Sequence, residues 1–148
     1  MIFPLDPDAV SHGIQLSVAP VFLLTAVSGM IGAVSGRLAR IIDRARFLEQ
    51  QILDKTAQNT ELSYAELGEL RVRGLLANGA IGLLTLCAFS IGVTVIILFL
   101  GETLDFQGLR ISIVAFLSGI VAFLLALVCF LIETIIATRL LNFARVRG

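Results

Sequence analysis

Three long apolar runs, separated by polar segments, dominate the pattern of this chain. They cover residues 14–36, 75–100 and 111–138. As an α-helix rising about 1.5 Å per residue, even the shortest run would be about 34 Å long, more than the roughly 30 Å hydrocarbon core of a bilayer. The pattern therefore predicts an all-α integral membrane protein with three transmembrane helices.

The polar segment at residues 37–74 follows the first run without a helix breaker. Its apolar residues recur at alternating steps of three and four, which predicts one packed face on a charged helix: Leu38, Ile41, Ala45, Leu48 and Ile52. The sequence Gln58-Asn59-Thr60 is typical of a turn, and Ser63 with Glu66 fits a capping box that opens a second helix. We therefore expect an extended helical hairpin between the first and second spans.

Composition and charge support one membrane domain over residues 1–148. The chain is 57% hydrophobic with a mean hydropathy of +0.98 and no net charge. Of its 11 Lys and Arg residues, all but Arg110 lie in residues 37–73 or 139–148. Positively charged segments flanking membrane helices usually lie in the cytoplasm. This rule places the N-terminus outside, with the hairpin and the C-terminus in the cytoplasm.

Two sequence blocks on the first predicted helix carry a family resemblance. Residues 20–24 read P-V-F-L-L, and residues 37–46 read R-L-A-R-I-I-D-R-A-R. With these blocks the chain resembles a bacterial family catalogued as Domain of Unknown Function 2721. The resemblance covers most of the chain and implies three spans in a bacterial inner membrane. It implies no activity, so it transfers no functional residue.

Small residues recur along two of the predicted spans. Ser28, Gly32 and Gly36 are four residues apart on the first span. The third span carries a similar series at steps of three and four: Ser112, Ala115, Gly119, Ala122, Ala126, Cys129, Glu133 and Ala137. Small residues allow membrane helices to approach closely. These faces either pack the three helices of one subunit or, as we infer from their extent, also join copies into a homo-oligomer.

The sequence contains no arrangement that predicts an enzyme. The single histidine, His12, precedes the first span, and the spans contain no Asp. Serine–histidine catalysis and a paired-aspartate intramembrane protease are therefore not expected. No metal-binding or phosphate-binding motif is present, so we expect no cofactor and no metal. Carboxylates, beginning with Asp43, interleave with the basic residues of 37–73, which argues against nucleic-acid binding.

Glu133 is the one acidic residue inside an apolar run, and two interpretations stay open. A charge in a span is costly and normally faces a partner or water. Glu133 is either an ion-binding or proton-carrying site, or it forms a salt bridge with Arg37 or Arg40 at a similar depth. Asn78 could complete such an intramembrane polar layer.

Two function classes follow, of which an ion channel is slightly favoured. In a homo-oligomeric channel, Ser28, Gly32 and Ser35 would line the pore. Acidic residues at the outer mouth would enrich cations: Asp6, Asp8, Glu102 and Asp105. The alternative is a non-conducting scaffold anchored in the lipid bilayer, which binds a partner through the cytoplasmic hairpin.

Overall fold

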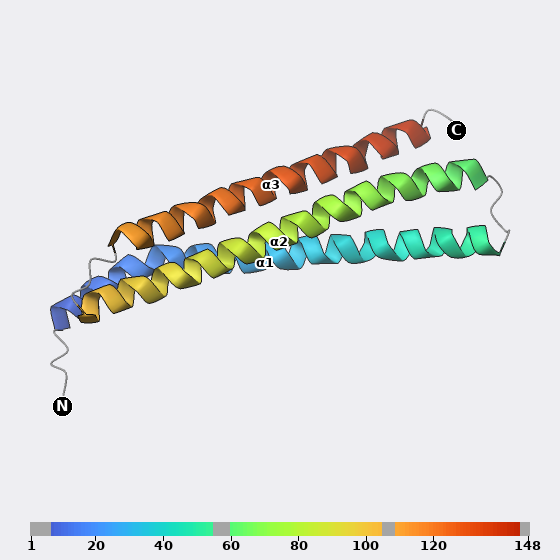
Figure 1. Cartoon of the computed structure of the whole chain (residues 1–148). Coiled ribbons are helices and arrows are strands. Elements are labelled where there is room, and N and C mark those ends of the chain that lie inside the picture. Colours follow the sequence, from blue (N-terminus) through green and yellow to red (C-terminus); the bar gives the residue numbers. More distant parts are fainter. Residues whose placement is uncertain (1–6, 55–59, 105–108, 146–148) are drawn as a thin grey trace. The chain divides into compact units, whose positions relative to one another are not determined.

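The computed structural model describes three long helices and, within residues 7–54, 60–104 and 109–145, no strand. In chain order they are α1 (Pro7–Leu53), α2 (Thr60–Leu104) and α3 (Leu109–Arg145) (Figure 1). All three are long and apolar enough to cross a membrane. The prediction of an all-α protein with three spans is confirmed. Pro20 lies inside α1, and the helix continues past it.

The start of α2 differs from the prediction. The helix begins at Thr60, so Ser63 already lies within it and the predicted capping box does not open it. Thr60 suits a helix start, and Glu61 in the first turn complements the positive end of the helix dipole. The predicted turn at residues 58–60 is therefore wrong at Thr60, and its other two positions lie outside the described residues. At the other end of the chain, α3 continues past residue 138 to Arg145.

The chain divides into two compact units, and each takes a segment from every helix. The first unit comprises Met1–Met30 with Leu83–Leu124, and the second comprises Ile31–Gly82 with Leu125–Gly148. Among the described side chains of the first unit, the only charged one is Arg110. The described charged residues are otherwise in the second unit.

Buried positions recur every seven residues on all three helices. They are Pro20, Val27, Val34, Ile41 and Leu48 on α1; Leu70, Ala77, Leu84 and Ile91 on α2; and Ser112, Gly119, Ala126 and Glu133 on α3. A second series on α2, also in steps of seven, is Ala80, Cys87 and Thr94. Seven residues make nearly two helical turns, so each series keeps one face toward neighbouring helices, as in a coiled coil.

The small-residue face of α3 is used inside the first unit. A Cβ added at Gly119 would lie 3.3 Å from the Cβ of Ser90, 3.5 Å from the backbone oxygen of Cys87 and 3.6 Å from Cγ1 of Ile91. Glycine thus allows α3 to approach α2 closely at this point. This observation supports packing within one subunit as the role of the α3 series.

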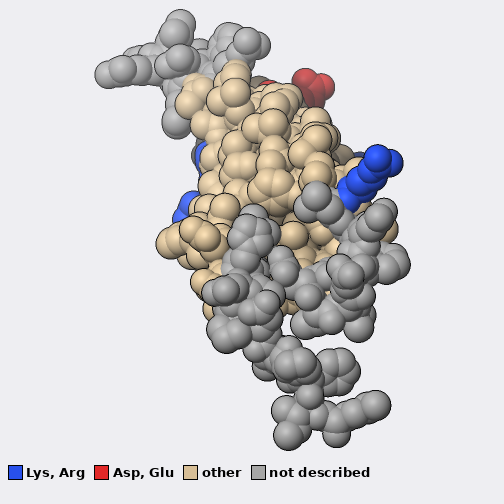
Figure 2. Space-filling view, turned by 90° about the vertical axis from the view of Figure 1, so that its left-hand side faces the viewer, with Lys and Arg blue, Asp and Glu red and all other residues tan. Residues whose placement is uncertain are grey.

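The outward surface of the spans is apolar. Phe22, Phe89 and Val114 are exposed by 72%, 69% and 68% of their surface. Figure 2 shows uncharged residues over most of the described surface that it presents, with few charged side chains. Large side chains exposed in such number would be unfavourable in water, whereas lipid chains solvate them well.

The helical hairpin, formed by residues 37–53 of α1 and 60–74 of α2, has its own small core in the second unit. Ile41 and Leu48 pack with Leu70, and Ala45 and Leu67 cover them. The predicted apolar face of residues 38–52 therefore faces inward. An ion pair joins the two arms beside this core, with Arg44 Nη2 2.8 Å from Oε1 of Glu66.

Candidate functional site

Glu133 lies in the second unit on the inward face of α3. It takes the place that Ser112, Gly119 and Ala126 occupy in the preceding repeats, so the helix directs its side chain toward the other two helices. Its side chain is 1% exposed. A buried carboxylate needs ionic and hydrogen-bonding partners, because burial removes its hydration.

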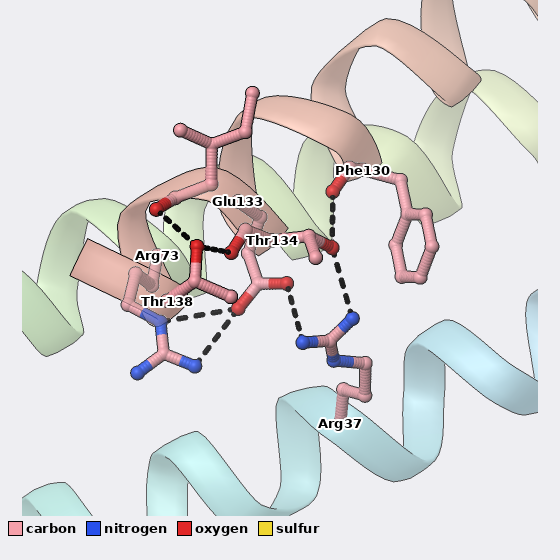
Figure 3. Close-up of polar contacts among 7 residues, drawn as sticks. Arg37, Arg73, Phe130, Glu133, Thr134 and Thr138 are labelled. Atoms are coloured by element: carbon pink, nitrogen blue, oxygen red, sulfur yellow. Dashed lines mark hydrogen bonds and ion pairs between the residues drawn. The ribbon is translucent and has the colours of Figure 1, made fainter. Parts of the chain in front are cut away.

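Arg73 of α2 is the first of these partners. Its Nη2 and Nε donate hydrogen bonds of 2.9 and 3.1 Å to the same oxygen, Oε1 of Glu133 (Figure 3). The Arg73 side chain is 18% exposed. Two hydrogen bonds from one guanidinium group restrict both the position and the orientation of the Glu133 carboxylate relative to Arg73. This contact therefore ties α2 firmly to α3.

Arg37 of α1 is the second partner, and it contacts α3 in three ways. Its Nη2 lies 3.4 Å from Oε2 of Glu133, an ionic contact without a well-formed hydrogen bond. Its Nη1 donates a 3.0 Å hydrogen bond to Oγ1 of Thr134, and its guanidinium carbon lies 5.1 Å from the ring centroid of Phe130. Thr134 donates its own hydroxyl proton to the carbonyl of Phe130, which leaves its oxygen free to accept from Arg37.

Together, Arg37, Arg73 and Glu133 form an ion cluster with one side chain from each helix (Figure 3). Its charges sum to +1, from two guanidinium groups and one carboxylate. Both carboxylate oxygens face guanidinium groups, so a cation would have to displace an arginine to bind Glu133. The described residues contain no group of three or more His, Cys, Asp or Glu that could hold a metal ion.

The structure brings together only part of the predicted polar layer. Arg37 contacts Glu133, whereas Arg40 and Asn78 are exposed and have no described contact with Glu133. Arg40 precedes buried Ile41 by one residue and Asn78 follows buried Ala77 by one, and each step turns a side chain by about 100° around the helix. The ion cluster takes its second arginine from position 73 instead.

Sequence reasoning missed Arg73, although the chain carries a usable signal for it. Arg73 lies seven residues before Ala80, in the same series as Cys87 and Thr94. Extending that series backwards would have placed Arg73 on the inward face of α2. By charge alone, Arg73 belongs with the basic residues that flank the span.

The predicted pore-lining residues all lie on the surface of the chain. Ser28, Gly32 and Ser35 are exposed, and a Cβ added at Gly32 would meet nothing within 4 Å. At about 100° per residue, they lie on average about 120° around α1 from its buried face. Of the predicted acidic mouth, Asp6 and Asp105 lie outside the described residues, and the side chains of Asp8 and Glu102 are not described.

A groove runs along the hairpin. It has a volume of about 490 Å³. Most of its lining is apolar, with one acidic and one basic side chain: Ile41, Ile42, Ala45, Glu49, Leu67, Gly68, Leu70, Arg71 and Gly74.

Three membrane-length helices with an apolar exterior and a buried ion cluster define an integral membrane protein of three helices. Within that class, the chain belongs to the family described as protein of unknown function DUF2721, whose model matches residues 17–143. No curated protein and no solved structure matches the chain significantly. The membership confirms the resemblance seen in the sequence, and it brings no activity with it.

Proposed function

We propose that this protein is a homo-oligomeric ion channel of the bacterial inner membrane that favours cations and needs no cofactor or catalytic group. The observation that carries the proposal is the outward face of α1. Ser28, Gly32 and Ser35 are exposed there. Large apolar side chains at these positions would make more favourable contacts with lipid than serine and glycine do. Glycine and serine on a membrane helix favour close contact with another helix. They also offer hydroxyl and backbone groups to water.

In the proposed assembly, copies of α1 surround a common axis with this face toward it. The acidic residues near the outer ends of the helices would then raise the local concentration of cations. At the cytoplasmic side, where the basic residues lie, Glu133 neutralises part of the charge of Arg37 and Arg73. The ion cluster would thereby lower the barrier that free arginines would pose to cations.

Ion flux through purified protein in liposomes tests this proposal. We expect cation flux that exceeds anion flux, and block of that flux when a water-soluble thiol reagent modifies Ser28→Cys in a cysteine-free background. The matched control is Phe22→Cys, because Phe22 is 72% exposed about 120° around α1 from Ser28. Liposomes that stay tight to both ion classes would refute conduction. Equal block at both positions would refute the assigned lining.

The groove along the hairpin supports a second candidate, a membrane scaffold that binds a partner protein. Its lining is mainly apolar, with Glu49 and Arg71 among its residues. An amphipathic helix fits such a groove when its apolar side faces inward. A photoreactive residue at Gly68, where an added Cβ meets nothing within 4 Å, would report the occupant. We expect a single protein adduct in intact membranes, and its loss when Ala45→Trp fills the groove.

A photoreactive residue at exposed Glu69, which does not line the groove, is the control for that experiment. Equal yields from both positions, or an adduct that survives Ala45→Trp, would contradict specific binding in the groove. An adduct with a second copy of the chain would assign the groove to self-assembly instead.

A further inference from the structure

A cavity in the second unit is lined by four arginines. It has a volume of about 260 Å³, and its walls are formed by α1 and α2: Arg37, Arg40, Ile41, Arg44, Leu70 and Arg73. Ile41 and Leu70 belong to the hairpin core, so they give the cavity an apolar wall that does not compete for charged ligands. The cavity does not include the outward face of α1. It shares Ile41 and Leu70 with the hairpin groove, but its polar lining is four arginines, whereas that of the groove is Glu49 and Arg71.

The protein neutralises these arginines only in part. Arg37 and Arg73 share the single carboxylate of Glu133, and Arg44 pairs with Glu66. Arg40 forms no ion pair with any described residue. Four guanidinium groups against two carboxylates leave two positive charges. Arginine does not lose its proton in proteins, so this excess persists unless an anion binds.

The cavity also lies at a depth where phosphate groups are abundant. Arg37 directly follows the apolar run 14–36, and Arg40 is about 5 Å further along the helix axis at about 1.5 Å per residue. The polar headgroup layer on each side of a bilayer is about 5 to 7 Å thick. Arg73 immediately precedes the second apolar run from the other arm. If the runs span the bilayer, the cavity therefore opens in the headgroup layer.

Guanidinium groups suit phosphate by shape as well as charge. A planar guanidinium edge can donate two parallel hydrogen bonds to two phosphate oxygens, which a lysine cannot do. Basic pockets between membrane helices on the cytoplasmic side bind anionic lipid headgroups in this way. Arg40 has its donors available, and Arg37, Arg44 and Arg73 would add charge from the other walls.

We propose that this cavity binds a phosphate group, carried either by an anionic lipid or by a soluble phosphate compound, with Arg40 as its principal ligand. The bound phosphate offsets the two excess positive charges between α1 and α2. This site lies at the hairpin and does not use the outward face of α1, although Arg37 and Arg73 belong to both the cavity and the ion cluster.

Native mass spectrometry and thermal unfolding of the purified protein in detergent test the site. In one arm of the experiment, cardiolipin or phosphatidylglycerol is added, with phosphatidylcholine as the neutral comparison. In the other arm of the experiment, inorganic phosphate or glycerol phosphate is added. We expect a saturable adduct and a raised melting temperature in one arm. The arm that responds identifies the source of the phosphate.

The variant Arg40→Gln removes the cavity arginine that makes no ion pair with a described residue, so we expect it to leave the ion cluster and the fold in place. We expect it to weaken phosphate binding about tenfold, equivalent to about 1.4 kcal/mol. Arg46→Gln is the matched control, because it removes the same charge from an exposed position of α1 that does not line the cavity. Arg40→Lys keeps the charge but not the planar edge, so its affinity for phosphate should lie between those of Arg40→Gln and Arg46→Gln.

The proposal is overturned if neither arm produces saturable binding. It is equally overturned if Arg46→Gln weakens binding as much as Arg40→Gln does, since the effect would then be one of surface charge in general. Because liposome flux is measured separately, a failure of this site and a failure of the proposed channel are distinguishable.

Discussion

Replacing Glu133 by glutamine tests whether the ion cluster holds the three helices together. The change keeps the size of the side chain and removes the carboxylate charge that both Arg37 and Arg73 contact. Removing one partner from a buried ion pair costs roughly 3–5 kcal/mol, because the remaining charge stays buried. Arg37 and Arg73 keep 29% and 18% of their side-chain exposure, so water relieves part of this cost. We expect a loss of about 3 kcal/mol in the free energy of unfolding.

The geometry further predicts which arginine is coupled more strongly to Glu133. Arg73 donates two hydrogen bonds to Oε1, whereas Arg37 makes one 3.4 Å ionic contact with Oε2. Double-mutant cycles with Arg73→Gln and Arg37→Gln should give coupling energies of about 2 and at most about 1 kcal/mol. The stability loss of the single variant Arg37→Gln does not measure its coupling to Glu133, because the change also removes the contacts of Arg37 with Thr134 and Phe130.

Unfolding can be measured in mixed micelles by titrating SDS and following the reactivity of a cysteine at Ala126, with the native cysteines replaced by alanine. Ala126 is 1% exposed and lies one repeat before Glu133 on the same face of α3. Glu69→Gln serves as a control at an exposed carboxylate without an ion pair to any described residue. Coupling that is negligible for Arg73, or larger for Arg37 than for Arg73, would refute the reasoning.

Further predictions concern glycine packing and the hairpin core. Gly119→Val should lower unfolding stability by about 1–3 kcal/mol through overpacking, because an added Cβ already meets α2 at 3.3 Å. Gly32→Val, with nothing within 4 Å of its Cβ, should leave the subunit folded but reduce the oligomer seen by crosslinking in membranes; an unchanged oligomer would contradict the assigned interface. Leu48→Ala should cost about 2–5 kcal/mol in hairpin stability and speed amide exchange in residues 41–52. Phe47→Ala, at a side chain exposed by 50%, should change exchange far less, and equal effects would contradict the assigned core.

Features that depend on position along a helix could be predicted from the residues. The three spans follow from uninterrupted apolar runs, and the inward face of residues 38–52 follows from spacings of three and four. These patterns are local, because hydrogen bonds within each helix and the hydrophobic periodicity of its side chains arise from neighbours in the chain. The start of α2 was predicted less well, because Thr60 and Ser63 are both suited to helix starts.

Features that depend on the direction around a helix needed the packed structure. The polar residues Arg37, Arg40, Arg73 and Asn78 all lie within four residues of the end of an apolar run, yet among their described contacts only Arg37 and Arg73 reach Glu133. The glycines at 32 and 119 look alike in their sequence context, yet one has empty space beside it and the other contacts α2.

Sequence alone thus sets how deep each side chain lies in the membrane, since depth follows from counting residues along a rigid helix. Packing of the three helices against one another decides which side of each helix faces inward. A step of one residue turns a side chain by about 100° around the helix axis. That turn is enough to leave Arg40 exposed beside buried Ile41, whereas Arg73, which is seven residues before buried Ala80, reaches Glu133.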